Sequence, residues 1–160
     1  MMTKKIFAML LLVYCYSYSQ QIIADFNNDK VKDTLNYKCF RIGEIKDIVE
    51  PTCKLTLELR NLNKVYHFDL PYVYYPVISN CGNGCISLYD NAKDTEYTQE
   101  YNYSKKYDNW ILTIDETRYN YENGKVENNL PRDYLLGIDG RKYTIVREIQ
   151  KRRGKGRLVK

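Results

Sequence analysis

The residues best suited to chemistry lie close together in the segment 25–33. Oxygen-bearing side chains occupy its first, third, fifth and ninth positions, and the seventh residue can contribute its backbone carbonyl. This spacing is typical of a calcium-binding loop, because Ca²⁺ takes about six to eight oxygen ligands from a tightly curled backbone. The predicted ligands are Asp25, Asn27, Asp29, Val31 (through its carbonyl) and Asp33.

The ligand types and two departures from the usual loop define the expected ion and its affinity. The segment contains no Cys or His, which disfavours zinc and copper, and Mg²⁺ gives up its waters reluctantly, so we expect one Ca²⁺. Lys30 occupies the position where a glycine usually makes the turn, at a cost of ~1–2 kcal/mol for a left-handed backbone. Asn36 occupies the place of the closing acid of an EF-hand loop. We therefore expect modest affinity, on the order of 10⁻⁴–10⁻³ M.

The segment also resembles a known type of loop. The sequence Asp-Phe-Asn-Asn-Asp-Lys-Val-Lys-Asp of residues 25–33 is similar to the D-x-[DN]-x-D-G-x-x-D loop of FG-GAP and dockerin-like calcium-binding proteins. The resemblance covers this segment and its apolar flanks, in a single copy, so a multi-bladed propeller does not follow from it. The alternative interpretation is an Asx-rich surface turn whose side chains bond to their own backbone.

The first nineteen residues are typical of a secretory signal peptide. Lys4 and Lys5 precede an apolar run over 6–13, and Ser17 and Ser19 suit cleavage before Gln20. The run is shorter than the ~20 apolar residues of a membrane-spanning helix, so we expect a secreted or periplasmic protein without a transmembrane helix. Cys15 allows a lipoprotein as an alternative, which the bulky Tyr14 before it disfavours.

The basic net charge of +5 belongs to the two ends of the chain. Without Lys4, Lys5 and the six cations of 151–160, the 25 basic residues fall to 17, against 20 acidic ones. We therefore expect a mildly acidic domain over 20–150 and a solvated basic tail over 151–160. A polyanion partner for the tail is the alternative, but export argues against nucleic acid. The tail cations are Lys151, Arg152, Arg153, Lys155, Arg157 and Lys160.

Four cysteines follow the signal peptide, and an even number in an oxidising compartment predicts disulfides. Four cysteines can pair in three ways, and the pairing of sequence neighbours is Cys39–Cys53 with Cys81–Cys85. The first pair would close a loop worth roughly 3 kcal/mol, and two glycines permit the tight turn of the second. A zinc site is disfavoured because the chain has no Cys-x₂-Cys pair and His67 is its single histidine.

The alternation of apolar and polar residues predicts a mainly β fold, with a single antiparallel sheet or sandwich-like domain built of hairpins. Residues 54–60 alternate strictly, and 65–70 return with Tyr66, Phe68 and Leu70 on one face and His67 facing solvent. We also expect strands over 34–42 and 143–149, a hairpin over 110–114 and 117–121, and a short helix near 91–100. Asn123-Gly124 and Asp139-Gly140 predict turns.

The stapled segment between Ser79 and Ser87 is the predicted partner-binding region, because a short disulfide-closed loop loses little entropy on binding. A stapled hairpin end without a binding role is the alternative. A second recognition surface is conceivable at Tyr97, Tyr101, Tyr103 and Tyr107, since tyrosine is enriched at interfaces. The predicted partner-binding residues are Tyr74, Tyr75, Asn80, Gly82, Asn83, Gly84 and Tyr89.

The sequence favours a binding protein over an enzyme, because it contains no nucleophile elbow, zinc-binding His pair or phosphate-binding glycine loop. The signal peptide, the early calcium loop and the Tyr-rich hairpins together resemble small periplasmic proteins of Gram-negative bacteria. Some of these are calcium-binding inhibitors of lysozyme-type hydrolases that serve as immunity proteins. The resemblance implies a hydrolase or another envelope protein as partner. The alternatives are a structural surface module stabilised by calcium and a glycan hydrolase acting through paired carboxylates.

Overall fold

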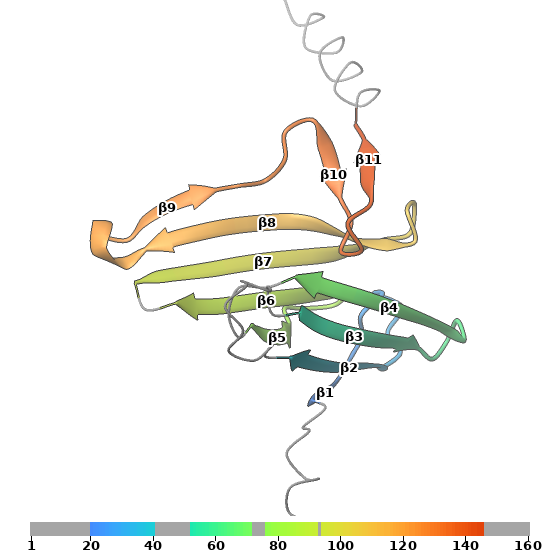
Figure 1. The fold of residues 1–160 in the computed structure, drawn as a ribbon. Helices are drawn as coiled ribbons and strands as arrows, with labels where there is room; N and C mark the ends of the chain where they lie inside the picture. Colours follow the sequence, from blue (N-terminus) through green and yellow to red (C-terminus); the bar gives the residue numbers. More distant parts are fainter. Residues whose placement is uncertain (1–19, 41–51, 72–75, 93, 146–160) are drawn as a thin grey trace, which may run out of the picture.

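The computed structural model describes residues 20–40, 52–71, 76–92 and 94–145, and most of them lie in antiparallel strands (Figure 1). The predicted mainly β fold is therefore confirmed. The signal peptide and the basic tail fall outside the described residues. The strands are β1 (Gln20–Ala24), β2 (Asp33–Phe40), β3 (Thr52–Leu59), β4 (Lys64–Pro71), β5 (Val77–Asn80), β6 (Cys85–Ala92), β7 (Thr95–Ser104), β8 (Asn109–Tyr119), β9 (Lys125–Asn128), β10 (Tyr134–Leu136) and β11 (Lys142–Thr144).

The strands form three sheets in which every neighbour is also the next strand in sequence. β1 to β4 make a four-stranded sheet, β5 to β9 a five-stranded sheet, and β10 and β11 a two-stranded one. In Figure 1 the four-stranded sheet lies beneath the right-hand half of β7 and β8, whose left-hand ends project past it. The domain is thus built of consecutive hairpins, as predicted, but divided among several sheets.

The alternation along β3 and β4 places one face of the four-stranded sheet in the core. Leu55, Leu57 and Leu59 are at most 1% exposed, while the intervening Lys54 and Glu58 are exposed. Leu55 lies opposite Phe68 on β4, and His67 on the other face bonds through Nδ1 to Thr56 Oγ1 at 3.2 Å. The predicted strand, its return and the solvent-facing histidine are all confirmed.

A single hydrophobic core joins the four-stranded and five-stranded sheets. Trp110 of β8 is fully buried and packs edge-on against Tyr66 and Phe68 of β4, with ring centroids 5.3 and 5.8 Å away. Ile86 and Leu88 of β6 belong to the same cluster. The strands next to the two loops described below therefore pack on the same hydrophobic core.

Two sequence predictions are wrong in this region. The expected hairpin over 110–121 is instead mostly one continuous strand, β8, which pairs with β7 along its whole length despite a β-bulge near Thr113. Past the bulge, Asp115 lies opposite Gln99 within the sheet rather than in a turn. The chain turns instead at Asn123-Gly124, where both residues have positive φ (54° and 74°), as that dipeptide predicts.

The short helix expected near 91–100 is also absent from the described part of that segment. β6 runs to Ala92 and β7 begins at Thr95, with Tyr97 paired to both Asp90 and Thr117. Within the described ranges the helical element is a 3₁₀ turn, Asn120–Glu122, and no helix is long and apolar enough to cross a membrane.

Candidate functional site

The segment 25–33 connects β1 to β2 as a compact loop closed by its own side chains. The Oδ1 atom of Asp25 accepts the backbone N–H groups of Asn27 at 3.3 Å and Asp29 at 3.1 Å, and its Oδ2 accepts that of Lys30 at 2.9 Å. Asp29 Oδ1 in turn accepts the N–H of Val31 at 2.8 Å. The first carboxylate therefore organises the loop around itself, leaving its remaining lone pairs available to a cation.

The backbone of the loop is left-handed where the sequence predicted a tight turn. Lys30 has φ 70° and Asn28 has φ 58°. Asn adopts this conformation readily, whereas a long side chain such as lysine does so at a cost of ~1–2 kcal/mol. Lys30 thus occupies a conformation that favours glycine, at the position that the predicted loop pattern gives to glycine.

Asp33, the first residue of β2, anchors the end of the loop. The side chain is fully buried, and its two oxygens accept the N–H groups of Phe26 at 3.0 Å and Arg60 at 3.1 Å. Burial raises the pKa of Asp33; the two backbone donors oppose this, and the negative charges of Asp29 and Asp25 add to it. A bound cation would relieve that repulsion.

Asp29 lies at the open side of the loop. Burial works to raise the pKa of this carboxyl, but the bonds from Val31, Asn27 and Asn61 outweigh it and lower the pKa. The Nδ2 group of Asn27 donates to Asp29 Oδ2 at 2.8 Å. The carboxylates of Asp25, Asp29 and Asp33 belong to one loop without converging on a single point within 4.8 Å.

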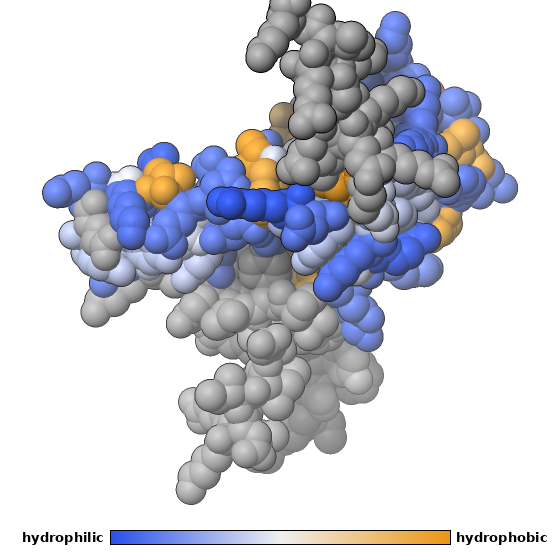
Figure 2. All heavy atoms as spheres, turned by 90° about the horizontal axis from the view of Figure 1, so that it is seen from above, coloured by the Kyte–Doolittle hydropathy of each residue, from blue (hydrophilic) through white to orange (hydrophobic). Residues whose placement is uncertain are grey.

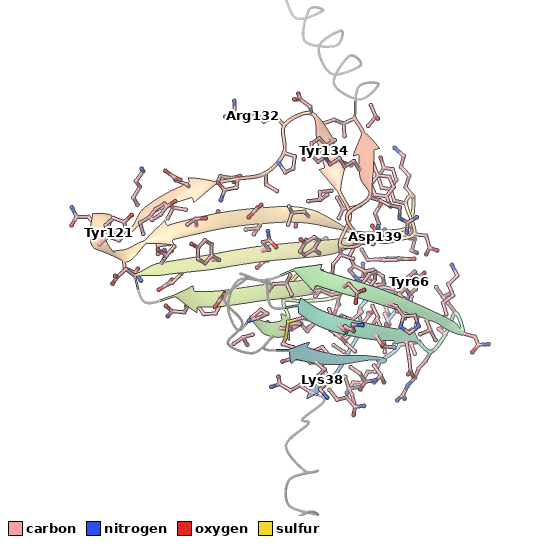
Figure 3. All side chains as sticks on the ribbon, viewed as in Figure 1. Lys38, Tyr66, Tyr121, Arg132, Tyr134 and Asp139 are labelled. Atoms are coloured by element: carbon pink, nitrogen blue, oxygen red, sulfur yellow. A yellow bond between two sulfur atoms is a disulfide. The ribbon has the colours of Figure 1, made fainter. Side chains whose placement is uncertain are left out.

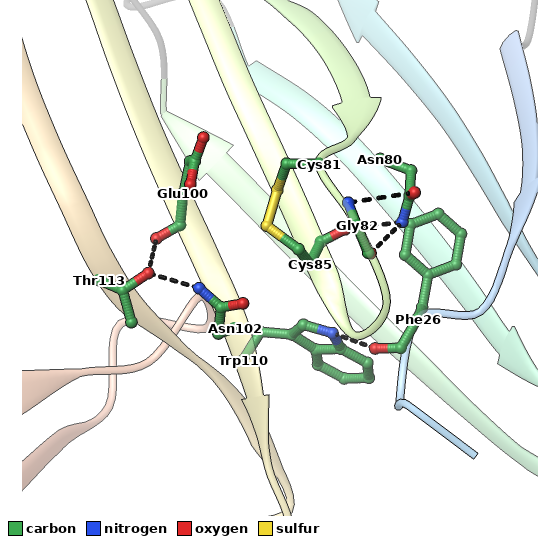
Figure 4. Close-up of a disulfide and its surroundings, with 9 residues drawn as sticks. All are labelled: Phe26, Asn80, Cys81, Gly82, Cys85, Glu100, Asn102, Trp110 and Thr113. Atoms are coloured by element: carbon green, nitrogen blue, oxygen red, sulfur yellow. Dashed lines mark hydrogen bonds between the residues drawn. A yellow bond between two sulfur atoms is a disulfide. The ribbon is translucent and has the colours of Figure 1, made fainter. Parts of the chain in front are cut away.

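The predicted calcium loop and the predicted partner-binding loop are in direct contact. The N–H of Gly84 donates to the carbonyl of Asp25 at 2.8 Å, and the N–H of Tyr103 donates to the carbonyl of Gly84 at 2.8 Å. The carbonyl of Phe26, next in the chain, accepts the indole Nε1–H of Trp110 at 2.6 Å. Backbone hydrogen bonds thus join two segments that lie more than fifty residues apart in the sequence. Figure 4 shows the bond between Trp110 and Phe26 beside the disulfide.

Asn80 shapes the predicted partner-binding loop, which the Cys81–Cys85 disulfide closes (Figure 4). Its Nδ2 donates to the carbonyls of Gly82 at 2.8 Å and Cys85 at 3.0 Å, while its Oδ1 accepts the N–H of Gly82 at 3.3 Å. Residues 80–83 are exposed, whereas Gly84 and Cys85 are buried. The loop therefore presents a short rigid tip on a buried base.

The second disulfide joins Cys39 of β2 to Cys53 of β3, which lie directly opposite each other with Cα atoms 4.0 Å apart. Both pairs are the local pairing that the sequence favoured, and the disulfide prediction is confirmed. The four sulfurs are accordingly not free ligands in this form of the protein.

The remaining predicted partner-binding residues do not all join the loop. Tyr89 lies on β6, half-buried, on the same face of the sheet as Cys85, while Tyr74 and Tyr75 fall outside the described residues. Of the second tyrosine group, Tyr101 is only 6% exposed and belongs to the core, so the group is not one exposed surface.

Exposed apolar residues are spread over the molecule. Figure 2 shows a mainly hydrophilic face with small, separate hydrophobic patches. Figure 3 shows Tyr121, which is 64% exposed, at the far end of the molecule from Tyr66, which packs against the core. Among the described residues, none of the exposed large hydrophobic side chains belongs to the tip at 80–83.

Two residues of this region were missed by sequence reasoning. Glu100 of β7 lies opposite Ser87 and beside the Cys81–Cys85 disulfide, a proximity that depends on strand register. Asp108 accepts the hydroxyls of Tyr66 at 2.8 Å and Tyr103 at 2.9 Å, and pairs with Lys64 at 2.8 Å. The partners of Asp108 are far apart in the sequence, so no local pattern predicts that they cluster.

Comparison with protein-family models, with curated proteins and with solved structures finds no match to this chain.

Proposed function

We propose that the protein is an exported calcium-binding β-domain that acts by binding another protein. The cation occupies the loop 25–33, with Asp25, Asn27, Asp29, Asp33 and the carbonyl of Val31 as ligands. The exposed tip of residues 80–83 contacts the partner. By the resemblance drawn from the sequence, that partner is a lysozyme-type hydrolase.

The observation that carries this proposal is the backbone contact between the two loops. Because Gly84 bonds to the carbonyl of Asp25 at 2.8 Å, a cation that tightens the first loop also steadies the base of the second. The burial of Asp33 and the nearby negative charges of Asp25 and Asp29 support a cation at this place. A binding tip that is ordered before contact loses less entropy when it binds.

A structural surface module is the second candidate, and one observation favours it. The carboxylates of Asp25, Asp29 and Asp33 all accept backbone N–H groups within or beside the loop. A loop closed in this way keeps its shape through Asx turns alone. In that case calcium adds stability, and the tip at 80–83 has no partner.

The metal is tested first, by thermal unfolding with calcium and with a chelator. A ligand bound only by the folded state stabilises it by RT ln(1 + [L]/Kd), about 1.4 kcal/mol at tenfold Kd. We expect Asp29→Ala to abolish this gain, while Asp69→Ala, at an exposed aspartate of β4, retains it. A gain of equal size in Asp29→Ala would refute the ligand assignment.

The partner is tested by titrating the calcium-loaded chain into a lysozyme assay. An inhibitor lowers lysozyme activity in proportion to its molar ratio, and a chelator weakens the effect. Asn83→Arg, at the exposed tip, should abolish inhibition, whereas Thr144→Arg, at an exposed position of β11, should not. Catalytic breakdown of peptidoglycan by the chain itself would indicate a hydrolase instead. If the chain neither inhibits lysozyme nor degrades peptidoglycan, the structural surface module is the function that agrees with the result.

A further inference from the structure

The five-stranded sheet has an open face on the side away from the core. Ile86 and Leu88 of β6 are buried in the core, so the alternate residue Tyr89 points to the opposite face. Residues that pair directly across strands share a face, and one row of such pairs crosses all five strands. None of the five side chains in this row is buried. The row consists of Val77, Tyr89, Thr98, Glu116 and Asn128.

The open face belongs to an acidic end of the sheet, where β7 and β8 project past the four-stranded sheet (Figure 1). The segments 89–100 and 115–129 hold eight of the chain's 20 acidic residues and three of its 25 basic ones. Glu100 pairs with Ser87 of β6, two residues from Tyr89, so its side chain lies on the open face beside Glu116 of the next strand. These like charges repel each other, and a cation between them would remove the repulsion.

The carboxylates of Glu100 and Glu116 are available to such a cation. Glu127 of β9, by contrast, already pairs with Lys125 at 2.9 Å. Within the described ranges neither a hydrogen bond nor an ion pair engages the carboxylate oxygens of Glu100 and Glu116. Both side chains are half-buried, so a cation that reaches them is partly shielded from water, which strengthens the attraction.

The chain itself contains a segment of the opposite charge that is long enough to reach this face. Residues 151–160 carry six cations and no acid, and fifteen residues follow Ile145, the last one described. A bridge between Ile111 and Gly137 holds the hairpin of β10 and β11 near the start of β8. The 11 residues of β8 span roughly 36 Å, whereas fifteen extended residues span up to about 50 Å. The segment can therefore reach any point along β8.

We propose that the basic segment 151–160 docks on the open face of the five-stranded sheet of its own chain. Its lysine and arginine side chains bring their charges to Glu100 and Glu116. Their apolar stems lie against the ring of Tyr89, which is half-buried on the same face. A segment joined covalently to its docking site acts at a local concentration of order millimolar, so individually weak contacts suffice.

The docked segment also lies next to the tip at 80–83. A carboxylate oxygen of Glu100 is within 4.8 Å of the Sγ atoms of Cys81 and Cys85, whose disulfide closes that tip. Docking therefore covers the acidic face beside the tip and keeps other cationic molecules away from it. The inference uses neither the calcium ligands nor the identity of a partner, so it does not depend on the proposed function.

The test is paramagnetic NMR on the full exported chain with a nitroxide attached through Leu158→Cys. At low salt we expect the nitroxide to broaden the backbone amide signals of Thr98 and Glu116. The amides of Thr56 and Glu58, on the outer face of the four-stranded sheet, should keep their line widths. Salt at about 1 M, where the screening length is about 3 Å, should remove the broadening because the contact is electrostatic.

Two double variants assign the docking face. Glu100→Gln with Glu116→Gln should remove most of the broadening at Thr98. Glu58→Gln with Asp69→Asn, at exposed acids of the four-stranded sheet, should leave it unchanged. The proposal is overturned if the open face shows no selective broadening, or if the first double variant keeps it in full. It is equally overturned if the broadening appears only when a spin-labelled chain is mixed with an isotope-labelled one, because the segment then docks on a second copy.

Discussion

At the scale of single residues, Asp108 in the turn between β7 and β8 binds three side chains. Its Oδ1 accepts both tyrosine hydroxyls, from Tyr66 of β4 and Tyr103 of β7, while Oδ2 pairs with Lys64. The bond from Lys64 is the main reason that the pKa of Asp108 is lowered, and burial and the same carboxylate raise the pKa of Tyr103 to about 12. One carboxylate thus ties an edge strand of one sheet to the turn between β7 and β8.

This cluster predicts a pH dependence on the acid side. A carboxyl whose folded-state pKa lies below its unfolded value stabilises the folded protein fully above the unfolded pKa, here near 3.8, and loses that contribution as the pH falls through the folded value. Asp108→Asn should therefore be less stable than the parent near neutral pH, and the difference should shrink as the pH falls below about 4. Urea unfolding at a series of pH values measures it.

Lys64→Gln provides the matched variant, because the Lys64 bond is the largest cause of the lowered pKa. We expect it to reduce the acid-side change without removing it, since both tyrosine hydroxyls still donate to Asp108. A stability difference between Asp108→Asn and the parent that stays constant across the pH series would contradict this account of the cluster.

At the scale of elements, Gly84 is where the loop 25–33, our proposed calcium site, contacts the stapled loop. Its φ of 76° favours glycine, and a Cβ placed there would lie 3.2 Å from the Cβ of Asn28. That separation is closer than ordinary van der Waals contact, so a side chain at this position would push the two loops apart. Packing and backbone conformation therefore both require a glycine here.

Gly84→Ala should destabilise the fold and reduce its response to calcium. Gly124→Ala is the matched control, because Gly124 has nearly the same φ, 74°, but no atom within 4 Å of the added Cβ. Both variants bear the left-handed strain of ~1–2 kcal/mol, and only Gly84→Ala should also lower the calcium-induced rise in melting temperature. Equal calcium responses in the two variants would show that the contact between the loops does not transmit binding.

Individual strands could be predicted from the sequence, but the pairing between strands could not. The strict alternation of Leu55, Leu57 and Leu59 predicts a half-buried strand because side-chain period is a local property. The course of β8 through Asp115 was not predictable, since a bulge near Thr113 reverses the alternation and is set by pairing with β7. Glu100 reaches the disulfide for the same reason: strand register brings it there.

At the scale of the whole molecule, Trp110 joins the two larger sheets. It stands on β8 of the five-stranded sheet, its ring packs on Tyr66 and Phe68 of the four-stranded sheet, and its indole N–H bonds to Phe26 in the loop between β1 and β2. Since Trp110 and Phe26 are both fully buried, no water replaces this bond. One side chain therefore links both sheets and the loop 25–33.

Trp110→Phe should lower the free energy of unfolding by about 2–4 kcal/mol, because it leaves a buried carbonyl without a donor and a cavity beside it. Tyr121→Phe, at a side chain 64% exposed, should change it by less than about 0.5 kcal/mol. Chemical denaturation of both variants beside the parent measures the difference. A loss below about 1 kcal/mol for Trp110→Phe would mean that the indole bond contributes little to joining the sheets.

The backbone bond between Gly84 and Asp25 has a thermodynamic consequence for anything the two loops hold. When occupancy of one loop alters the affinity of the other, linkage requires the reverse effect to have the same factor. A protein that grips the tip at 80–83 more firmly in the presence of calcium must itself raise the affinity of residues 25–33 for calcium. A lower dissociation constant for calcium in the presence of that protein would therefore reveal binding at the tip, although the ion is bound in the other loop.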